Sequence, residues 1–127
     1  MPNQFCKKPI VLEAAEQLEK EGISVEVINL RTIRPLDRET IIKSVIKTGR
    51  AVAVEDGYPQ SGVTAEILST IIESPAFDYL DAPPERITAW DIPLAYAKTL
   101  ESATIPQVEN IIKGVRKTLI GTNKTRK

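Results

Sequence analysis

Residues 25–37 read Val-Glu-Val-Ile-Asn-Leu-Arg-Thr-Ile-Arg-Pro-Leu-Asp, and this stretch indicates the fold. Its first part, 25–30, is rich in β-branched and apolar residues, as in a strand buried inside a parallel sheet. Pro35 ends the strand, and the side chain of Asp37 can cap a helix that follows. A strand that leads through a polar loop into a helix is the repeating unit of α/β proteins.

The remainder of the chain continues this alternation of helix and strand. Apolar residues at helical spacing predict four helices, at residues 9–22, 38–48, 62–73 and 107–120. In the third of these helices, Ile72 is expected to face inward. Short apolar runs predict strands at 51–54 and 86–90 besides 25–30. We therefore expect an α/β fold with three layers, in which three mainly parallel strands lie between helices.

Length and composition are consistent with one domain. The chain has 127 residues, and its 17 lysines and arginines equal its 17 aspartates and glutamates. No whole-chain field therefore attracts nucleic acid or an anionic membrane, and no apolar run approaches the ~18 residues of a membrane span. We expect an N-terminal segment at 1–9, the domain at 10–120 and a basic tail at 121–127.

The residue types that usually carry catalysis are scarce. The chain has no histidine and one cysteine, Cys6, which excludes a Ser-His-Asp triad, a histidine metal site and an internal disulfide. The glycines at 57 and 62 have phosphate-loop spacing, but Val63 and Thr64 replace the required Lys-Ser/Thr, so a turn before a helix is favoured. Glu55 and Asp56 follow a strand. They could serve as an acid/base pair or cation ligands, although a solvated loop is the more common case.

Two sets of side chains could form a protein-binding surface. Aromatic side chains lie on predicted loops and strand ends, where they either contact a partner or plug the sheet: Tyr58, Phe77, Tyr79, Trp90 and Tyr96. Arginines could pair with a partner's carboxylates or play structural roles: Arg31, Arg34, Arg38 and Arg86. Taken alone, Asp81 in its Leu-Asp-Ala-Pro loop is most simply a turn cap.

Two segments carry a family resemblance. Residues 27–37, "VINLRTIRPLD", and 74–101, "SPAFDYLDAPPERITAWDIPLAYAKTLE", resemble the C-terminal domain of pyruvate dehydrogenase E1 β subunits, in the transketolase-like group of thiamine-diphosphate enzymes. The resemblance covers about residues 12–119. It implies a transketolase C-terminal-domain-like fold in an α2β2 enzyme that decarboxylates pyruvate, feeds acetyl-CoA formation and lies in the mitochondrial matrix or bacterial cytoplasm. The alternatives are a stand-alone protein-binding module, or a fragment of a branched-chain 2-oxoacid dehydrogenase β subunit or a transketolase.

The resemblance also implies which roles this part of the subunit has. In the family, thiamine diphosphate, magnesium and the catalytic histidines are held by the α subunit and the N-terminal domain of β. This chain alone is then expected to be non-catalytic and to bind no cofactor. The implied partners are the E1 α subunit, a second β chain and the peripheral-subunit-binding domain of E2. Docking of E2 is expected at Asp81, Leu119 and Ile120.

The chain departs from the family pattern in several places, and two of them bear directly on the fold. The family has an apolar strand before the first helix, lying between the strands that match 25–30 and 51–54. Residues 3–8, Asn-Gln-Phe-Cys-Lys-Lys, stand in its place and make a poor buried strand, so those two strands are expected to be separated unless 3–8 or a second chain fills the gap. Thr64 stands where the family usually has a glycine.

Overall fold

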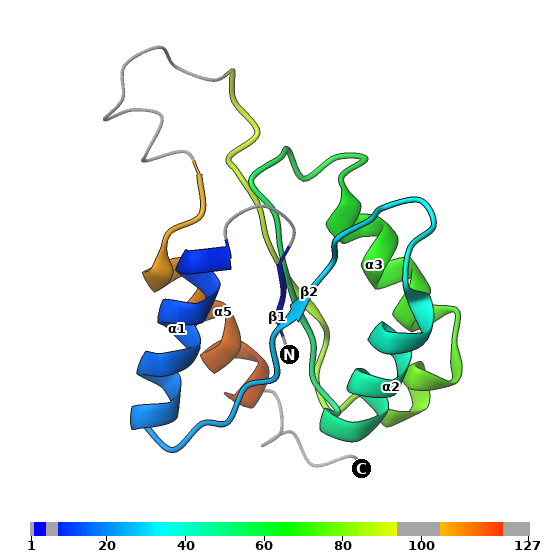
Figure 1. Cartoon of the computed structure of the whole chain (residues 1–127), viewed down its shortest axis with the longest axis horizontal. Coiled ribbons are helices and arrows are strands. Elements are labelled where there is room, and N and C mark those ends of the chain that lie inside the picture. Colours follow the sequence, from blue (N-terminus) through cyan, green and yellow to red (C-terminus); the bar gives the residue numbers. More distant parts are fainter. Residues whose placement is uncertain (1, 5–7, 94–104, 121–127) are drawn as a thin grey trace.

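The structure is a computed structural model that describes residues 2–4, 8–93 and 105–120 (Figure 1). Its elements in chain order are β1 (Pro2–Gln4), α1 (Lys8–Lys20), β2 (Ile28–Asn29), α2 (Arg38–Thr48), β3 (Val52–Val54), α3 (Val63–Ile72), the 3-10 helix η1 (Pro75–Tyr79), β4 (Glu85–Ile87) and α5 (Val108–Ile120). The four α-helices found in these ranges confirm the four that the sequence predicts. The helix η1 was not predicted.

The strands form one parallel sheet in the order β2-β1-β3-β4. The expectation of three strands was wrong, because Pro2–Gln4 forms a fourth. In the ladder, Asn3 lies opposite Ile28 of β2 on one side and Ala53 of β3 on the other. Since β1 lies between β2 and β3, the expected gap is filled by Pro2–Gln4, although this segment contains a proline and two polar residues. A ladder uses backbone groups, so its two neighbours stabilise this segment despite poor strand propensity.

All three predicted strands are shorter than expected, and two of them differ by more than one residue. β2 covers Ile28–Asn29 where we expected 25–30, and β4 covers Glu85–Ile87 where we expected 86–90. The short β1 offers β2 few backbone partners, so most of the 25–30 run lies beyond the ladder. Its valines, Val25 and Val27, are half-buried and pack against the core without pairing.

Helices cover both faces of the sheet, so the three-layer expectation is confirmed. Figure 1 shows α1 and α5 on one face and α2 and α3 on the other. Each face has its own core cluster. The first consists of Val11, Ala14, Leu18, Val52, Val54, Ile111, Ile112 and Val115. The second consists of Leu30, Ile41, Val45, Ala51, Ala53, Ile67, Ile71 and Ala76. Neighbouring strand residues alternate between the clusters because side chains leave a strand on alternate faces.

Local signals fix both ends of α2. As predicted, Asp37 caps the helix: its carboxylate accepts hydrogen bonds from the Thr40 hydroxyl at 2.7 Å and the Thr40 amide at 3.2 Å. The bond from the Thr40 hydroxyl has the largest effect and the bond from the Thr40 amide the next largest, and together they hold the pKa of the Asp37 carboxyl below its ordinary value. Gly49 ends the helix in the left-handed region, with φ of 73°.

Within the residues that the structure describes, no helix has the length and apolar character needed to cross a membrane.

Candidate docking surface

The short helix η1 brings apolar side chains to the surface beside the expected docking loop. Ser74 begins it by accepting a hydrogen bond from the Ala76 amide at 3.2 Å, and Pro75 occupies its first turn. Ala76 is fully buried, whereas Phe77 is 56% exposed. Ile72, at the end of α3, is 50% exposed, so its predicted inward orientation was wrong. Ile72 is the last residue of α3, just before the chain turns into η1, and it lines a surface hollow with Phe77.

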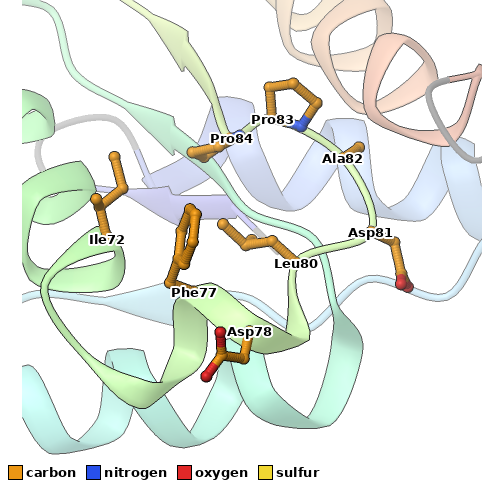
Figure 2. A pocket seen from close by; sticks show the side chains of 8 residues that line it. All are labelled: Ile72, Phe77, Asp78, Leu80, Asp81, Ala82, Pro83 and Pro84. Carbon is orange, nitrogen blue, oxygen red and sulfur yellow. The ribbon is translucent and has the colours of Figure 1, made fainter. Parts of the chain in front are cut away.

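Ile72 and Phe77 line a hollow of about 580 Å³ at the surface. Figure 2 shows Ile72, Phe77, Leu80 and Pro84 around it, while the carboxylates of Asp78 and Asp81 point away from its centre. An apolar floor with charged groups at the margin is the usual anatomy of a protein-binding patch. The hollow therefore has the composition of a docking surface and lacks the convergent polar groups of a catalytic pocket.

Asp81 is held at this margin by its backbone. Its amide donates to the Gly49 carbonyl oxygen at 2.8 Å, which ties the loop before β4 to the end of α2. Its side chain is 52% exposed and lies 3.8 Å from the guanidinium of Arg50, measured from Oδ2 to Nη1. The backbone bond fixes the position of Asp81, and the exposed carboxylate is available to a partner.

Arg50 connects Asp81 to the end of α5. Its Nε donates to the carbonyl oxygen of Thr118 at 3.4 Å, in the last turn of that helix. A cation is favourable there because the final carbonyls of a helix carry partial negative charge. Ile120, in the same turn, is 70% exposed, whereas Leu119 is half-buried and packs against the first core cluster.

The structure thus brings the three expected docking residues to one end of the molecule. Asp81 and the last turn of α5 both contact Arg50, and Ile120 offers an exposed apolar side chain at that end. Sequence reasoning missed Arg50. No local sequence pattern marks Arg50 as part of this surface, because its contact with Thr118 joins residues 68 positions apart in the chain.

Glu55 has a structural role that the sequence did not reveal. It is 5% exposed, so the expected solvated loop was wrong for this residue. Its carboxylate accepts hydrogen bonds from the Val63 amide and the Thr64 hydroxyl, each at 2.9 Å. The carboxylate therefore lies at the first turn of α3, where negative charge is favourable. Both of its oxygens are used within the fold, which leaves it poorly suited to acid/base work.

Thr64 joins this carboxylate to Arg86. The Thr64 side chain is fully buried, and its hydroxyl accepts from Nε of Arg86 at 3.0 Å while donating to Glu55. A second guanidinium nitrogen of Arg86 donates to the Pro59 carbonyl. Arg86 thus has a structural role, because two of its guanidinium nitrogens are used within the fold.

Of the other three candidate arginines, one has a structural role and two are exposed. Arg38 donates to the Thr70 hydroxyl and pairs with Glu66, each at 2.6 Å, so it links α2 to α3. Arg31 and Arg34 are exposed in the loop before α2. Neither lies with Asp81 at the margin of the hollow described above.

The aromatic side chains do not form a single patch. Phe77 belongs to the hollow, Tyr58 lines a separate depression beside Glu55, and Trp90 lies in a third beside α5. Cys6 and Tyr96 lie outside the described residues. Among the residues that are described, no three His, Cys, Asp or Glu side chains gather in a way that could hold a metal ion.

The fold and this surface define a class: a parallel α/β domain whose exposed features suit binding. The chain belongs to the transketolase C-terminal domain family, whose model matches residues 8–111.

Individual relatives show which members of the family this chain is similar to. Pyruvate dehydrogenase E1 component subunit beta, mitochondrial, of Homo sapiens is 58% identical over 108 residues, which are 85% of this chain and 30% of that protein. The protein of the same name from Bos taurus is 59% identical over 108 residues, with the same shares. The beta-1 subunit of Oryza sativa subsp. japonica is 57% identical over 106 residues, covering 84% of this chain and 28% of its own length. The chain thus spans about 30% of the length of these relatives.

A solved structure supports the fold. A split-gene transketolase, described as an inactive β4 tetramer, matches with a TM-score of 0.80 over 96% of this chain and 38% of its own. At 22% identity, this similarity concerns the fold alone.

Proposed function

We propose that this chain acts as the C-terminal domain of a pyruvate dehydrogenase E1 β subunit. In that role it contributes to subunit assembly and to E2 docking in the conversion of pyruvate to acetyl-CoA, with no catalytic residue of its own. The observation that supports this proposal is the 58% identity to the human E1 β subunit over 85% of this chain. The mitochondrial names of these relatives support a matrix location.

The proposed division of labour follows from the chemistry of the chain. It has no histidine, and its buried carboxylate, Glu55, is used by α3. As the family resemblance implies, we propose that thiamine diphosphate and magnesium are held by other parts of the enzyme. The domain was expected at 10–120, but β1 pairs with β2 and β3, so we propose that Pro2–Gln4 also belongs to it and that a basic tail follows at 121–127. The domain is proposed to pack against an E1 α subunit and a second β chain.

The proposed docking site for the E2 peripheral-subunit-binding domain comprises Asp81, Leu119 and Ile120. Three observations support it: Asp81 and the last turn of α5 share Arg50, Ile120 is exposed, and an apolar hollow adjoins Asp81. A carboxylate beside apolar surface suits a partner that carries a basic residue next to apolar ones. Leu119 contributes from beneath, by packing the end of α5 onto the core.

Co-purification tests the assembly role. Co-expressed with an E1 α subunit and an E2 binding domain, the chain should be recovered with both. Recovery with neither would favour the stand-alone binding module, and recovery with a branched-chain or transketolase partner instead would favour the sister enzymes.

Calorimetry tests the cofactor assignment. We expect no binding when thiamine diphosphate and magnesium are titrated into the chain, because it lacks histidine and its buried carboxylate is occupied. Tight, magnesium-dependent binding would contradict the proposal.

Surface plasmon resonance tests the docking residue. Asp81→Ala should weaken E2-domain binding at least roughly tenfold, since losing one member of a desolvated charge pair typically costs ~2–5 kcal/mol and ~1.4 kcal/mol is a factor of ten. Asp91→Ala is the matched control, because Asp91 is exposed and follows the other end of β4. Equal affinity of the wild type and Asp81→Ala would remove Asp81 from the interface.

A further inference from the structure

Asp81 already has a cation beside it in the free chain. Nη1 of Arg50 lies 3.8 Å from Asp81 Oδ2, and the side chains are 25% and 52% exposed. A partner's lysine or arginine that approaches this carboxylate meets the charge of Arg50 as well. The attraction expected of an unpaired carboxylate is therefore partly offset before any partner arrives.

The turn at Gly49 holds this pair together. Its carbonyl accepts from the Asp81 amide at 2.8 Å, and the next residue along the chain is Arg50. A Cβ at position 49 would lie 2.5 Å from Asp81 Oδ2, so the absence of a side chain leaves the space that the carboxylate occupies. One backbone turn thus places the Asp81 loop and the guanidinium side by side.

Arg50 also has a second contact that does not depend on Asp81. Its Nε donates to the Thr118 carbonyl oxygen at the end of α5. A guanidinium has five donors in a rigid fork, so one nitrogen can keep this contact while another leaves Asp81. The Arg50–Asp81 contact is long and therefore weak, so a partner that separates the two side chains breaks only a weak interaction.

We propose that Arg50 is an internal competitor for Asp81, so that a basic partner docks by displacing Arg50 from the carboxylate. This inference rests on the proposed docking function and adds to it a residue that limits affinity. It gives selectivity, because a weakly basic surface does not displace the guanidinium whereas a well-placed arginine or lysine does. Arg50 remains at the end of α5 in the docked state.

A double-mutant cycle on the full chain tests the competitor, with the isolated E2 peripheral-subunit-binding domain as the probe. Arg50→Gln should tighten binding about two- to fivefold, the range expected for removal of a partly exposed ion pair. Arg50→Lys keeps the charge and should bind like the wild type. In an Asp81→Asn background, Arg50→Gln should no longer tighten binding, because there is no carboxylate to release.

The cycle separates competition from a general charge effect and from a positioning role. Equal tightening in the Asp81→Asn background would reduce Arg50 to one surface charge among others, and weaker binding by Arg50→Gln would mean that it positions Asp81; either overturns the inference. If Asp81→Asn weakens binding and Arg50→Gln does not change it, the proposed docking site is supported and the proposed role of Arg50 is refuted. If neither the wild type nor Arg50→Gln binds while both unfold cooperatively, docking and competitor fall together.

Discussion

Replacing Thr64 by valine removes one hydroxyl from the buried contact between Glu55 and Arg86. Valine keeps the shape of threonine, so no cavity forms. The carboxylate loses the 2.9 Å bond from Thr64 and keeps the bond from the Val63 amide. Arg86 loses the acceptor for its Nε, formerly at 3.0 Å. The substitution therefore isolates the hydrogen bonds of this network.

The expected cost follows from burial. A hydrogen bond to a charged group contributes about 1.5–3 kcal/mol to stability. A buried charged group that loses its donor and cannot reach water loses this whole contribution. Glu55 is 5% exposed and cannot readily recover a donor, whereas the half-buried Arg86 can partly turn to water. We expect the free energy of unfolding to fall by about 2–4 kcal/mol. With about 2.1 cal/mol/K of unfolding entropy per residue, the Tm of this chain should fall by roughly 7–15 °C.

Chemical and thermal denaturation measure this loss against a matched control. Thr118 is also buried in a helix, but its hydroxyl donates only to the Val115 carbonyl of the same helix, at 2.6 Å. Thr118→Val leaves no buried charge without its donor, so it should lower the free energy of unfolding by only about 1 kcal/mol or less. If Thr64→Val proves as mild as this control, the network does not stabilise the fold and the reasoning about Glu55 is wrong.

Three further perturbations test other parts of the fold. Gly49→Ala should cost about 1–2 kcal/mol of unfolding free energy, since φ is 73°, and should weaken docking by moving Asp81; unchanged binding would contradict this. Leu18→Ala, in the first core cluster, should cost about 2–5 kcal/mol in urea denaturation. The lowered pKa of Asp37 means that its ionised form is favoured by folding, so its contribution is complete above the ordinary carboxyl pKa. That contribution fades as pH falls through the ordinary value towards the lower folded one, so the stability gap between wild type and Asp37→Ala should narrow in acid.

Much of the architecture could be predicted because its signals are local. Asp37 and Gly49 stand where a helix begins and ends, and the 3.6-residue spacing in α5 marks its buried face. β1 could not be predicted from its own composition, since its pairing depends on backbone groups of β2 and β3. The family pattern nevertheless located the gap that β1 fills.

The site was harder to predict than the fold. Asp81 came from the family resemblance, whereas Arg50 is brought to it by tertiary contacts that no sequence spacing encodes. The sequence places Glu55 beside Asp56 after a strand, and such a carboxylate pair most commonly lies in a solvated loop. The burial of Glu55 depends on where α3 begins, and Gly62 allows the close approach: a Cβ there would lie 2.0 Å from the Glu55 carboxylate.

The central place of β1 also sets an order of events during folding. Both of its ladder partners are later in the chain, and Pro2 pairs with Val52. The hydrogen bonds between Pro2–Gln4 and β3 therefore cannot form until the chain as far as Val54 has been made. Closing so long a segment is slow compared with forming a helix, so we expect α1 and α2 to form before the middle of the sheet is joined. Pulse-labelled hydrogen exchange should then show the α2 amides protected earlier than those of β1.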